Sequence, residues 1–253
     1  MNAFITGAAS GIGKATAEAL LKRGWSLALA DIQPAELEDL KEQAPDRVSV
    51  YELDVTDSDA FDQAVADFAG KHSGRLSLMF NCAGILEINR FTEISRQRHE
   101  QIIDINIKGV INGCQAAYPF LRDTPAAQVI NMSSASSTYG IPEFAVYSAS
   151  KFAVQGLTEA LNLEWRNDGI HVGDIMPPFV KTPMLSSQGR SSPIIDALGV
   201  NLTADDVAEA VMKQLSRRLT HRTVSLPFTL LYMLNQITPR PLTGLLIRFL
   251  SRS

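Results

Sequence analysis

Short apolar runs alternate with longer amphipathic stretches along most of this chain of 253 residues. Six runs are typical of buried strands, and a segment of helical length follows each one. These runs are AFIT (3–6), SLALAD (26–31), VSVYELD (48–54), LSLMFN (76–81), AQVINMSS (127–134) and IHVGDIMP (170–177). Alternating strands and helices favour a parallel sheet with helices on both faces. We therefore predict an α/β fold with a doubly wound, mostly parallel sheet, built as a single domain.

The stretch AVYSASKFAVQ (145–155) has the period of a helix and carries two polar groups one turn apart. Tyr147 and Lys151 share one helical face, and only small residues lie between them. Apolar positions continue the pattern to Trp165, and Asp168-Gly169 predicts its end. We therefore expect the phenol and the amine to point the same way from the first turns of a long helix.

This pair suggests acid–base chemistry. A tyrosine has a pKa of about 10, but a positive charge roughly 4 Å away favours the phenolate by about 4 kcal/mol, or about 3 pKa units. Such a phenol exchanges protons near neutral pH. The alternative is an exposed tyrosine beside a solvated lysine, and this pair alone does not decide between them.

The turn between the first strand and the next helix carries three glycines, Gly7, Gly11 and Gly13. Glycine at such a turn lets backbone approach a diphosphate and lets the helix pack on the strand. The strand before the turn and the helix after it favour a dinucleotide site over a tight turn without a ligand.

The second predicted strand ends at Asp31, 18 residues after Gly13. An acidic residue at this position accepts hydrogen bonds from the adenosine ribose and repels a 2′-phosphate. Neither Ile32 nor Ser10 supplies a cation for that phosphate, so the sequence favours NAD over NADP. Asp31 could instead begin a loop and cap the following helix.

Asp54 ends the third predicted strand. We expect it near the adenine, with Val55 against the face of the base. The alternative is that Asp54 is the N-cap of the helix that starts near Asp57.

Composition and cysteine content indicate a globular protein in a reducing compartment. The hydrophobic fraction is 45% and the mean hydropathy is +0.03. Two cysteines, Cys82 and Cys114, give no disulfide framework. The N-terminal residues lack the features of a signal peptide. We therefore expect a cytoplasmic location.

Charge is distributed unevenly along the chain. Up to position 209 there are 16 basic and 27 acidic residues, a net charge of −11, and the seven charged residues after it are all basic. An acidic body argues against general binding of nucleic acid. We expect a small-molecule substrate and no nucleic-acid partner.

Several motifs occur in a fixed order along the chain: TGAASGIG (6–13), LDVTD (53–57), NCAG (81–84), DINIKG (104–109), and INMSS (130–134) followed by YSASK (147–151). Together they resemble one family, the short-chain dehydrogenases/reductases, from residue 2 to about residue 185. The resemblance implies a Rossmann fold and an enzyme acting on CH–OH groups. With the preference that Asp31 indicates, we expect an NAD-dependent enzyme, no metal, and a homodimer or homotetramer.

The same resemblance implies the catalytic residues. Tyr147 is expected to be the acid–base on the substrate oxygen, and Ser134 to orient that oxygen by a hydrogen bond. Lys151 is expected to lower the pKa of Tyr147 and to hold the nicotinamide ribose. Asn106 is expected to kink its helix and to anchor a water that leads protons to Lys151. Ser133, next to Ser134, is expected to bond locally.

The family also implies a set of cofactor contacts and one departure from its usual pattern. After the sixth strand, Pro178 replaces the usual glycine, which removes an amide donor and stiffens the backbone. We expect a stiffer lid there and retained cofactor binding. The expected contacts are Gly7, Ser10, Gly11, Ile12, Gly13, Asp31, Asp54, Val55, Asn81, Ala83, Gly84, Tyr147, Lys151, Pro177, Val180 and Thr182.

Two segments are expected to form the substrate pocket, the loop 135–146 and a lid at about 183–200. Only Arg190 offers itself to an anionic substrate. The expected apolar wall consists of Tyr139, Ile141, Phe144, Met184 and Leu185.

The catalytic domain is expected to span 1–222, followed by an apolar, basic extension over 223–253. The extension predicts two short amphipathic helices, too short to span a membrane. They could lie on a membrane surface, pack on a partner subunit, or roof a lipophilic pocket. An apolar roof favours a lipophilic alcohol or ketone as substrate.

Two other functions remain open. One is an NADPH-preferring carbonyl reductase, which Asp31 argues against. The other is a non-catalytic dinucleotide-binding scaffold at a membrane surface, which the retained Tyr147 and Lys151 argue against. His99 and His171 are expected to be structural.

Overall fold

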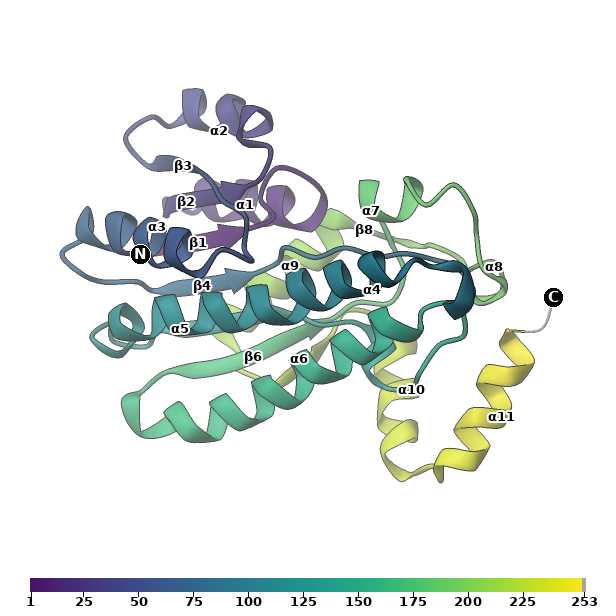
Figure 1. The fold of residues 1–253 in the computed structure, drawn as a ribbon. Helices are drawn as coiled ribbons and strands as arrows, with labels where there is room; N and C mark the ends of the chain where they lie inside the picture. Colours follow the sequence, from purple (N-terminus) through teal and green to yellow (C-terminus); the bar gives the residue numbers. More distant parts are fainter. Residues whose placement is uncertain (252–253) are drawn as a thin grey trace.

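The computed structural model describes residues 1–251 and contains a central sheet of seven parallel strands (Figure 1). Their order is β3-β2-β1-β4-β5-β6-β9, so the chain reverses its direction of winding between β1 and β4. In open sheets of this kind ligands bind at that reversal, outside the carboxyl ends of the strands. The bounds are β1 Asn2–Thr6, β2 Ser26–Asp31, β3 Val48–Glu52, β4 Leu78–Asn81, β5 Gln128–Met132, β6 His171–Met176 and β9 His221–Thr223.

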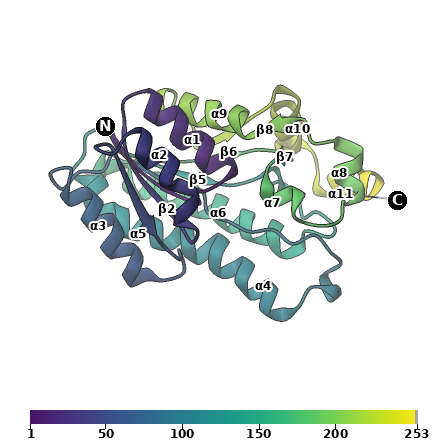
Figure 2. The same cartoon turned by 90° about the horizontal axis from the view of Figure 1, so that it is seen from above.

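Helices cover both faces of this sheet, as predicted (Figure 2). One layer contains α1 (Gly11–Lys22), α2 (Glu38–Gln43) and α9 (Ala204–Ser216). The opposite layer contains α3 (Ser58–Gly70), α5 (Gly109–Arg122) and α6 (Ala145–Glu164). The predicted doubly wound α/β fold is thus confirmed.

Alternating side chains of the strands feed two separate cores. In β1, Ala3 and Ile5 face the α1 layer, and Phe4 faces the α3 layer. Phe4 stacks on Phe61 of α3 with ring centroids 5.9 Å apart. Complete burial of a side chain of this size contributes about 1.5–3 kcal/mol. The two cores hold the sheet rigid, and its carboxyl edge is therefore a fixed platform.

The smaller elements gather at that carboxyl edge. Helix α4 (Arg96–Ile103) runs through a π-helical turn (Asp104–Lys108) into α5. Short strands β7 (Val180–Lys181) and β8 (Leu202–Thr203) pair with each other, and α7 (Pro183–Ser186) and α8 (Pro193–Leu198) lie between them in the chain. One-turn 3₁₀ helices occupy Pro34–Leu37, Phe91–Glu93, Ala135–Ser137 and Trp165–Asp168.

The long helix predicted around Tyr147 begins and ends as expected. Helix α6 ends at Glu164, a 3₁₀ turn follows, and Gly169 adopts a left-handed conformation with φ of 74°. Glycine takes this conformation without the steric penalty that other residues incur. The first turns of α6 therefore reach the carboxyl edge of the sheet.

The seventh strand, β9, was not predicted. It has three half-buried residues and no apolar run, so its sequence carries no strand pattern. It forms because it pairs with β6 and because His221 is held between two carboxylates. His221 Nδ1 lies 3.0 Å from Asp174 Oδ2, and His221 Nε2 lies 3.0 Å from Glu159 Oε1.

The extension after β9 forms the two predicted helices, α10 (Leu226–Ile237) and α11 (Arg240–Leu250). They make a V-shaped hairpin that projects from the end of the molecule where α8 also lies (Figure 1). Among the described residues, no helix combines the length and the apolar character needed to cross a bilayer.

Candidate active site

One cavity of about 1280 Å³ runs along the carboxyl edge of the sheet. It is bordered by residues at or just after the ends of five strands: Gly7, Asp31, Cys82, Met132 and Pro177. The lid segment and both helices of the extension line the rest of its wall. The cavity therefore joins the glycine turn at one end to the substrate loops at the other.

The glycine turn requires glycine because its backbone packs closely on neighbouring backbone. Gly7 has φ of +65°, and a Cβ there would lie 2.8 Å from the Ala83 backbone. A Cβ on Gly13 would lie 2.1 Å from the Gly7 carbonyl oxygen. Gly11, with φ of +51°, begins α1, whose amino end faces the cavity. Backbone amides and a helix dipole at this place fit a dinucleotide diphosphate.

Asp31 joins the glycine turn to the end of β2. Its Oδ2 accepts a hydrogen bond from the Ala9 amide (3.0 Å), and its Oδ1 accepts one from the Gln33 amide (3.1 Å). The following 3₁₀ helix has no side-chain cap, so the capping role is not seen. Asp31 lines the cavity together with Ile32 and Gln33.

Asp54 and Val55 also line the cavity. The Asp54 carboxylate accepts hydrogen bonds from the amide and the hydroxyl of Thr56, at 2.9 and 2.8 Å. The cap of α3 is Asp57, whose side chain accepts from the Ala60 amide. The alternative that Asp54 caps this helix is therefore wrong.

Asn81, which was expected to line the cofactor, does not belong to the cavity wall. Its side chain is 2% exposed and points into the core between β5 and α5. It donates to Asn131 Oδ1 at 2.9 Å and contacts the Cys114 sulfur at 3.6 Å. The neighbouring cavity wall is formed by Cys82, Ala83 and Gly84.

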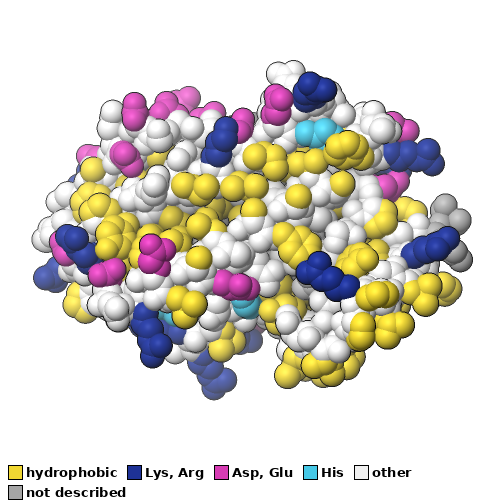
Figure 3. Space-filling view, turned by 60° about the horizontal axis from the view of Figure 1, so that its bottom comes forward, with side chains coloured by type: hydrophobic (Ala, Val, Ile, Leu, Met, Phe, Trp, Pro, Cys, Tyr) yellow, Lys and Arg dark blue, Asp and Glu magenta, His cyan; other side chains and the backbone are white. Residues whose placement is uncertain are grey.

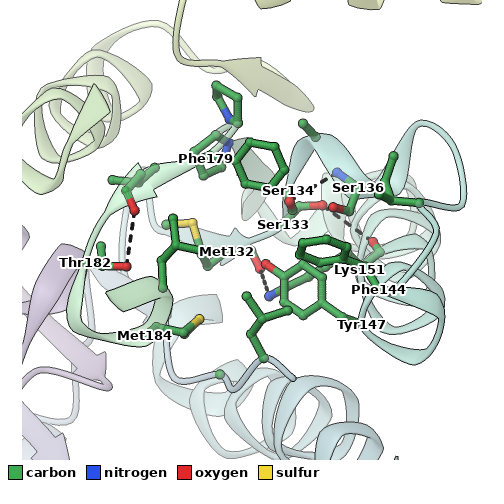
Figure 4. A pocket seen from close by; sticks show the side chains of 18 of the residues that line it. Met132, Ser133, Ser134, Ser136, Phe144, Tyr147, Lys151, Phe179, Thr182 and Met184 are labelled. Atoms are coloured by element: carbon green, nitrogen blue, oxygen red, sulfur yellow. Dashed lines mark hydrogen bonds between the residues drawn. The ribbon is translucent and has the colours of Figure 1, made fainter. Parts of the chain in front are cut away.

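Tyr147 and Lys151 point from the first turns of α6 into the cavity, and Ser134 enters from the end of β5 (Figure 4). The Lys151 ammonium lies 5.5 Å from the centre of the Tyr147 ring and donates to the Met132 carbonyl at 2.8 Å. Ser134 Oγ accepts from the Ser136 amide at 3.1 Å. Its neighbour Ser133 donates to the Lys151 carbonyl at 3.5 Å.

Burial dominates the electrostatics of this group. It raises the pKa of Tyr147 above its ordinary value, and the nearby Ser134 hydroxyl only partly opposes it. It also lowers the pKa of Lys151 to about 8. The expected lowering of the Tyr147 pKa by Lys151 is therefore not seen, because the ammonium bonds to a carbonyl oxygen instead of the phenol.

Asn106 sits in the π-helical turn and is fully buried. Its amide nitrogen donates to the Ile85 carbonyl (3.0 Å) and to Ser150 Oγ (3.1 Å), and its oxygen accepts from the Ile85 amide (2.8 Å). It does not line the cavity. This places Asn106 behind the wall, where it fixes the loop after β4 against α6.

The segment after β6 folds back over the glycine turn. A Cβ on Gly11 would lie 3.4 Å from the Thr182 methyl group. Pro177, Pro178, Val180 and Thr182 all line the cavity. The proline at 178 thus leaves the two following contact positions facing the dinucleotide end.

The substrate end of the cavity is apolar. A buried cluster of Leu86, Ile88, Phe144, Ile194 and Ile195 lies there. The expected wall residues Tyr139, Ile141, Phe144, Met184 and Leu185 all line the cavity. Sequence reasoning missed Leu86 and Phe179. It left open whether the extension covers the pocket, and residues of α10 and α11 do line the cavity. The alternating apolar positions of GILEI (84–88), directly after the NCAG motif, were the available signal.

The lid is fastened to the body by polar side chains. Arg190 donates to Glu143 Oε1 at 2.8 Å and to Asn89 Oδ1 at 2.5 Å. Gln188 accepts from the Ile88 amide at 3.1 Å and donates to the Leu86 carbonyl at 3.1 Å. Arg190 therefore joins the lid to the loops at Asn89 and Glu143, a contact that we call the latch. Its side chain does not line the cavity.

The two histidines considered from sequence lie away from the cavity. His99 contacts the Phe91 carbonyl at 3.1 Å and stacks on its ring, and His171 contacts the Leu219 carbonyl at 3.1 Å. Within residues 1–251, no group of His, Cys, Asp and Glu side chains is arranged to hold a metal.

Comparison with known proteins agrees with this geometry. The sequence model of the family described as short chain dehydrogenase matches residues 1–192. A 3-oxoacyl-(acyl-carrier-protein) reductase of Thermotoga maritima is 34% identical over 184 residues, 72% of this chain and 74% of the relative.

Two solved structures show the same architecture with a dinucleotide. A short chain dehydrogenase/reductase of Burkholderia phymatum in complex with NAD has a TM-score of 0.81 and 27% identity, over 92% of this chain and 91% of that one. The structure described as ElxO with NADP bound has a TM-score of 0.78 and 25% identity, over 88% and 96%. The chain thus belongs to the short-chain dehydrogenase family, whose oxidoreductases act on alcohol and carbonyl groups with a nicotinamide dinucleotide.

Proposed function

We propose that the protein transfers hydride between NAD(H) and a lipophilic alcohol or ketone. One observation carries this proposal. The Ser134 and Tyr147 hydroxyls and the Lys151 amine meet where the glycine-lined half of one cavity joins its apolar half.

The side chains divide the work of the reaction. Bound NAD supplies the hydride acceptor. Ser134 donates a hydrogen bond that orients the substrate oxygen. Tyr147 must act as a phenolate, which takes the hydroxyl proton as the carbonyl forms. Lys151 has a pKa of about 8, so its amine is charged at lower pH. This ammonium stabilises the Tyr147 phenolate when the lysine side chain turns away from the Met132 carbonyl. Asn106 holds the loop at Ile85 in place.

Several observations around Asp31 support NAD, and not NADP, as the cofactor. Its carboxylate lies at the end of β2, where the adenosine ribose of a bound dinucleotide is expected. The two cations of the cavity wall in residues 1–251, Arg98 and Lys151, come from α4 and α6. A 2′-phosphate would meet a negative charge there with no compensating cation. An NADPH-preferring carbonyl reductase is the alternative that this arrangement disfavours.

The substrate half of the cavity supports a neutral, lipophilic substrate. Arg98, at its edge, pairs with Glu87 at 3.1 Å, and Arg190 pairs with Glu143. Both guanidinium groups are thus neutralised by carboxylates. An anionic substrate would lie against an apolar wall, where no cation is available to pair with its charge.

A dehydrogenase screen tests this function. Purified protein with NAD is offered steroid, retinoid, long-chain aliphatic and sugar alcohols, and the absorbance of NADH is followed. We expect turnover of a lipophilic class and none of the sugars. Tyr147→Phe should lower the rate by about 10² to 10⁴ while the dinucleotide still binds. Substantial activity of this variant would contradict the mechanism, and turnover of sugars alone would contradict the substrate class.

Two further aspects belong to this proposal. We propose a cytoplasmic homodimer or homotetramer, with the exposed Leu163 of α6 as a candidate contact, since its side chain is 72% exposed. A non-catalytic scaffold is disfavoured because Ser134, Tyr147 and Lys151 are all present and lie together.

A further inference from the structure

The hairpin of α10 and α11 carries most of the exposed large apolar side chains of the molecule. Ten of the eighteen such side chains in the described part of the chain belong to it. On α10, an exposed row with helical spacing consists of Leu226, Leu230, Met233, Leu234 and Ile237. This row makes one continuous outer face along the whole helix.

Helix α11 continues the outer face. Leu242, Leu245, Leu246 and Phe249 follow the same helical spacing and are 48–70% exposed. Figure 3 shows hydrophobic side chains crowded over the projecting end of the molecule beside the C-terminus. Contiguous exposed apolar surface of this kind marks an interaction site.

The hairpin holds its place without this outer face. Asn235 donates to the Thr138 carbonyl at 3.4 Å and accepts from the Thr243 hydroxyl at 3.0 Å. Ile247 and Leu250 pack on the cluster that contains Ile194 and Ile195 of the lid. The inner sides of both helices thus attach to the substrate loops, and the outer sides contribute little to the fold.

The cavity extends to the hairpin, where half-exposed apolar side chains line it. Leu231 and Leu234 of α10 and Leu242 and Leu246 of α11 line the cavity, and each is 48–58% exposed. A lipophilic molecule entering here would pass from an apolar surface into an apolar cavity.

The charge of the hairpin indicates which kind of partner binds this outer face. No acidic residue follows Glu209. Arg240 and Arg248 are exposed, and Arg248 borders the apolar face three positions after Leu245. A symmetric pairing of two hairpins would bring arginines together with no carboxylate to neutralise them. An anionic lipid surface complements both the apolar face and its arginines.

We propose that the outer face of α10 and α11 docks on an anionic lipid bilayer, with the part of the cavity lined by Leu231 and Leu246 turned toward the lipid. The docking itself is independent of catalysis. The passage of substrate from the bilayer into the cavity rests on the proposed function.

Vesicle co-sedimentation tests the docking with the full chain. Phosphatidylcholine vesicles with and without phosphatidylglycerol are compared at low and high salt. We expect binding to the anionic vesicles that weakens with salt. Leu245→Asp should weaken it by about tenfold or more, and Arg248→Glu by about fivefold or more.

Matched variants control for loss of structure. Leu219 is 48% exposed in the loop before β9, and Leu245 is 64% exposed, so Leu219→Asp should leave vesicle binding unchanged. Arg23 is exposed at the end of α1, and Arg23→Glu is the control for Arg248→Glu. Each variant is checked for an unchanged thermal midpoint and for dinucleotide binding.

Three results would overturn the proposal. These are absence of binding to anionic vesicles, equal binding to neutral ones, and an oligomer that Leu245→Asp dissociates without any vesicle binding. Co-sedimentation requires no turnover. Binding with no active substrate class would therefore contradict the proposed function and leave the docking intact.

Discussion

At the scale of single residues, Lys151 shows how the environment of a side chain determines its chemistry. The residue is 4% exposed, and its amine donates a hydrogen bond to the Met132 carbonyl. Burial lowers its pKa from 10.5 to about 8. A charge kept in such a place destabilises the fold near neutral pH and is available to stabilise a phenolate.

This shift has a defined effect on stability. Between pH 8 and pH 10.5 the unfolded chain holds a proton that folded Lys151 has lost, so the free energy of unfolding rises with pH in this window. The rise amounts to about 3 kcal/mol. The variant Lys151→Met should not show this rise in the free energy of unfolding.

Urea unfolding at several pH values across that window measures the difference between wild type and variant. Lys181→Met, which removes an exposed lysine, is the control and should keep the rise. The same pH slope in Lys151→Met would show that this amine is not the group responsible.

Asp31 carries the second prediction at this scale. Asp31→Ala removes the negative charge expected beside the adenosine ribose and should narrow the preference for NAD over NADP by about tenfold, equivalent to about 1.4 kcal/mol. Steady-state rates or dinucleotide affinities give the ratio. Asp54→Ala, which removes the other acidic residue of the same cavity end, serves as the comparison. An unchanged ratio would remove the assigned role of Asp31.

At the scale of elements, the lid is held by contacts that reach across the chain. Residues 188 and 190 bond to the loop at 86–89 and to Glu143, about which the sequence pattern alone says nothing. Glu143 has φ of 68°, a conformation uncommon outside glycine, and its position supports the latch. The lid is closed over the apolar wall by these bonds.

Arg190→Ala should loosen this closure. A partly exposed ion pair contributes about 0.2–1 kcal/mol, so we expect KM to rise by up to about fivefold with kcat changed less. Steady-state kinetics with the substrate found in the screen measure both constants. Arg122→Ala, which breaks an exposed pair with Asp123, should change neither. An effect on thermal stability alone would show that the contact does not govern the lid.

Elements differed in how well their sequence predicted them. Six strands were predicted because each is an apolar run; five of them are buried on both faces, and β3, at the edge of the sheet, is half-buried. Helix α6 was predicted because its period and its terminal Gly169 are clear. Strand β9 was missed because three polar residues carry no period, and tertiary contacts of His221 hold it. Local pattern does not report such contacts.

At the scale of the whole molecule, motif spacing predicted the composition of the site better than its geometry. Fifteen of the sixteen expected cofactor contacts line one cavity; the exception is Asn81, whose amide turns into the core to pair with Asn131. The orientation of Lys151 toward Met132 was also missed. The orientations of Asn81 and Lys151 each depend on which nearby group the side chain forms a hydrogen bond with. The spacing of residues in the sequence does not determine that partner.

The placement of the extension was left open by its sequence. An amphipathic pattern predicts two helices but not which surface receives their inner sides. The structure shows those sides against the substrate loops and the lid. The match of the family's sequence model ends at residue 192, so the extension lies outside it.

The hydrogen bond from Asn235 to the Thr138 carbonyl links the hairpin to the loop that begins at Ser134. We expect a tilt of α10 relative to the body to act on this loop, whose Ser134 is proposed to orient the substrate oxygen. Thermodynamic reciprocity then demands a return effect. If attachment of the hairpin changes the affinity for a ligand in the cavity, that ligand must change the strength of attachment by the same factor.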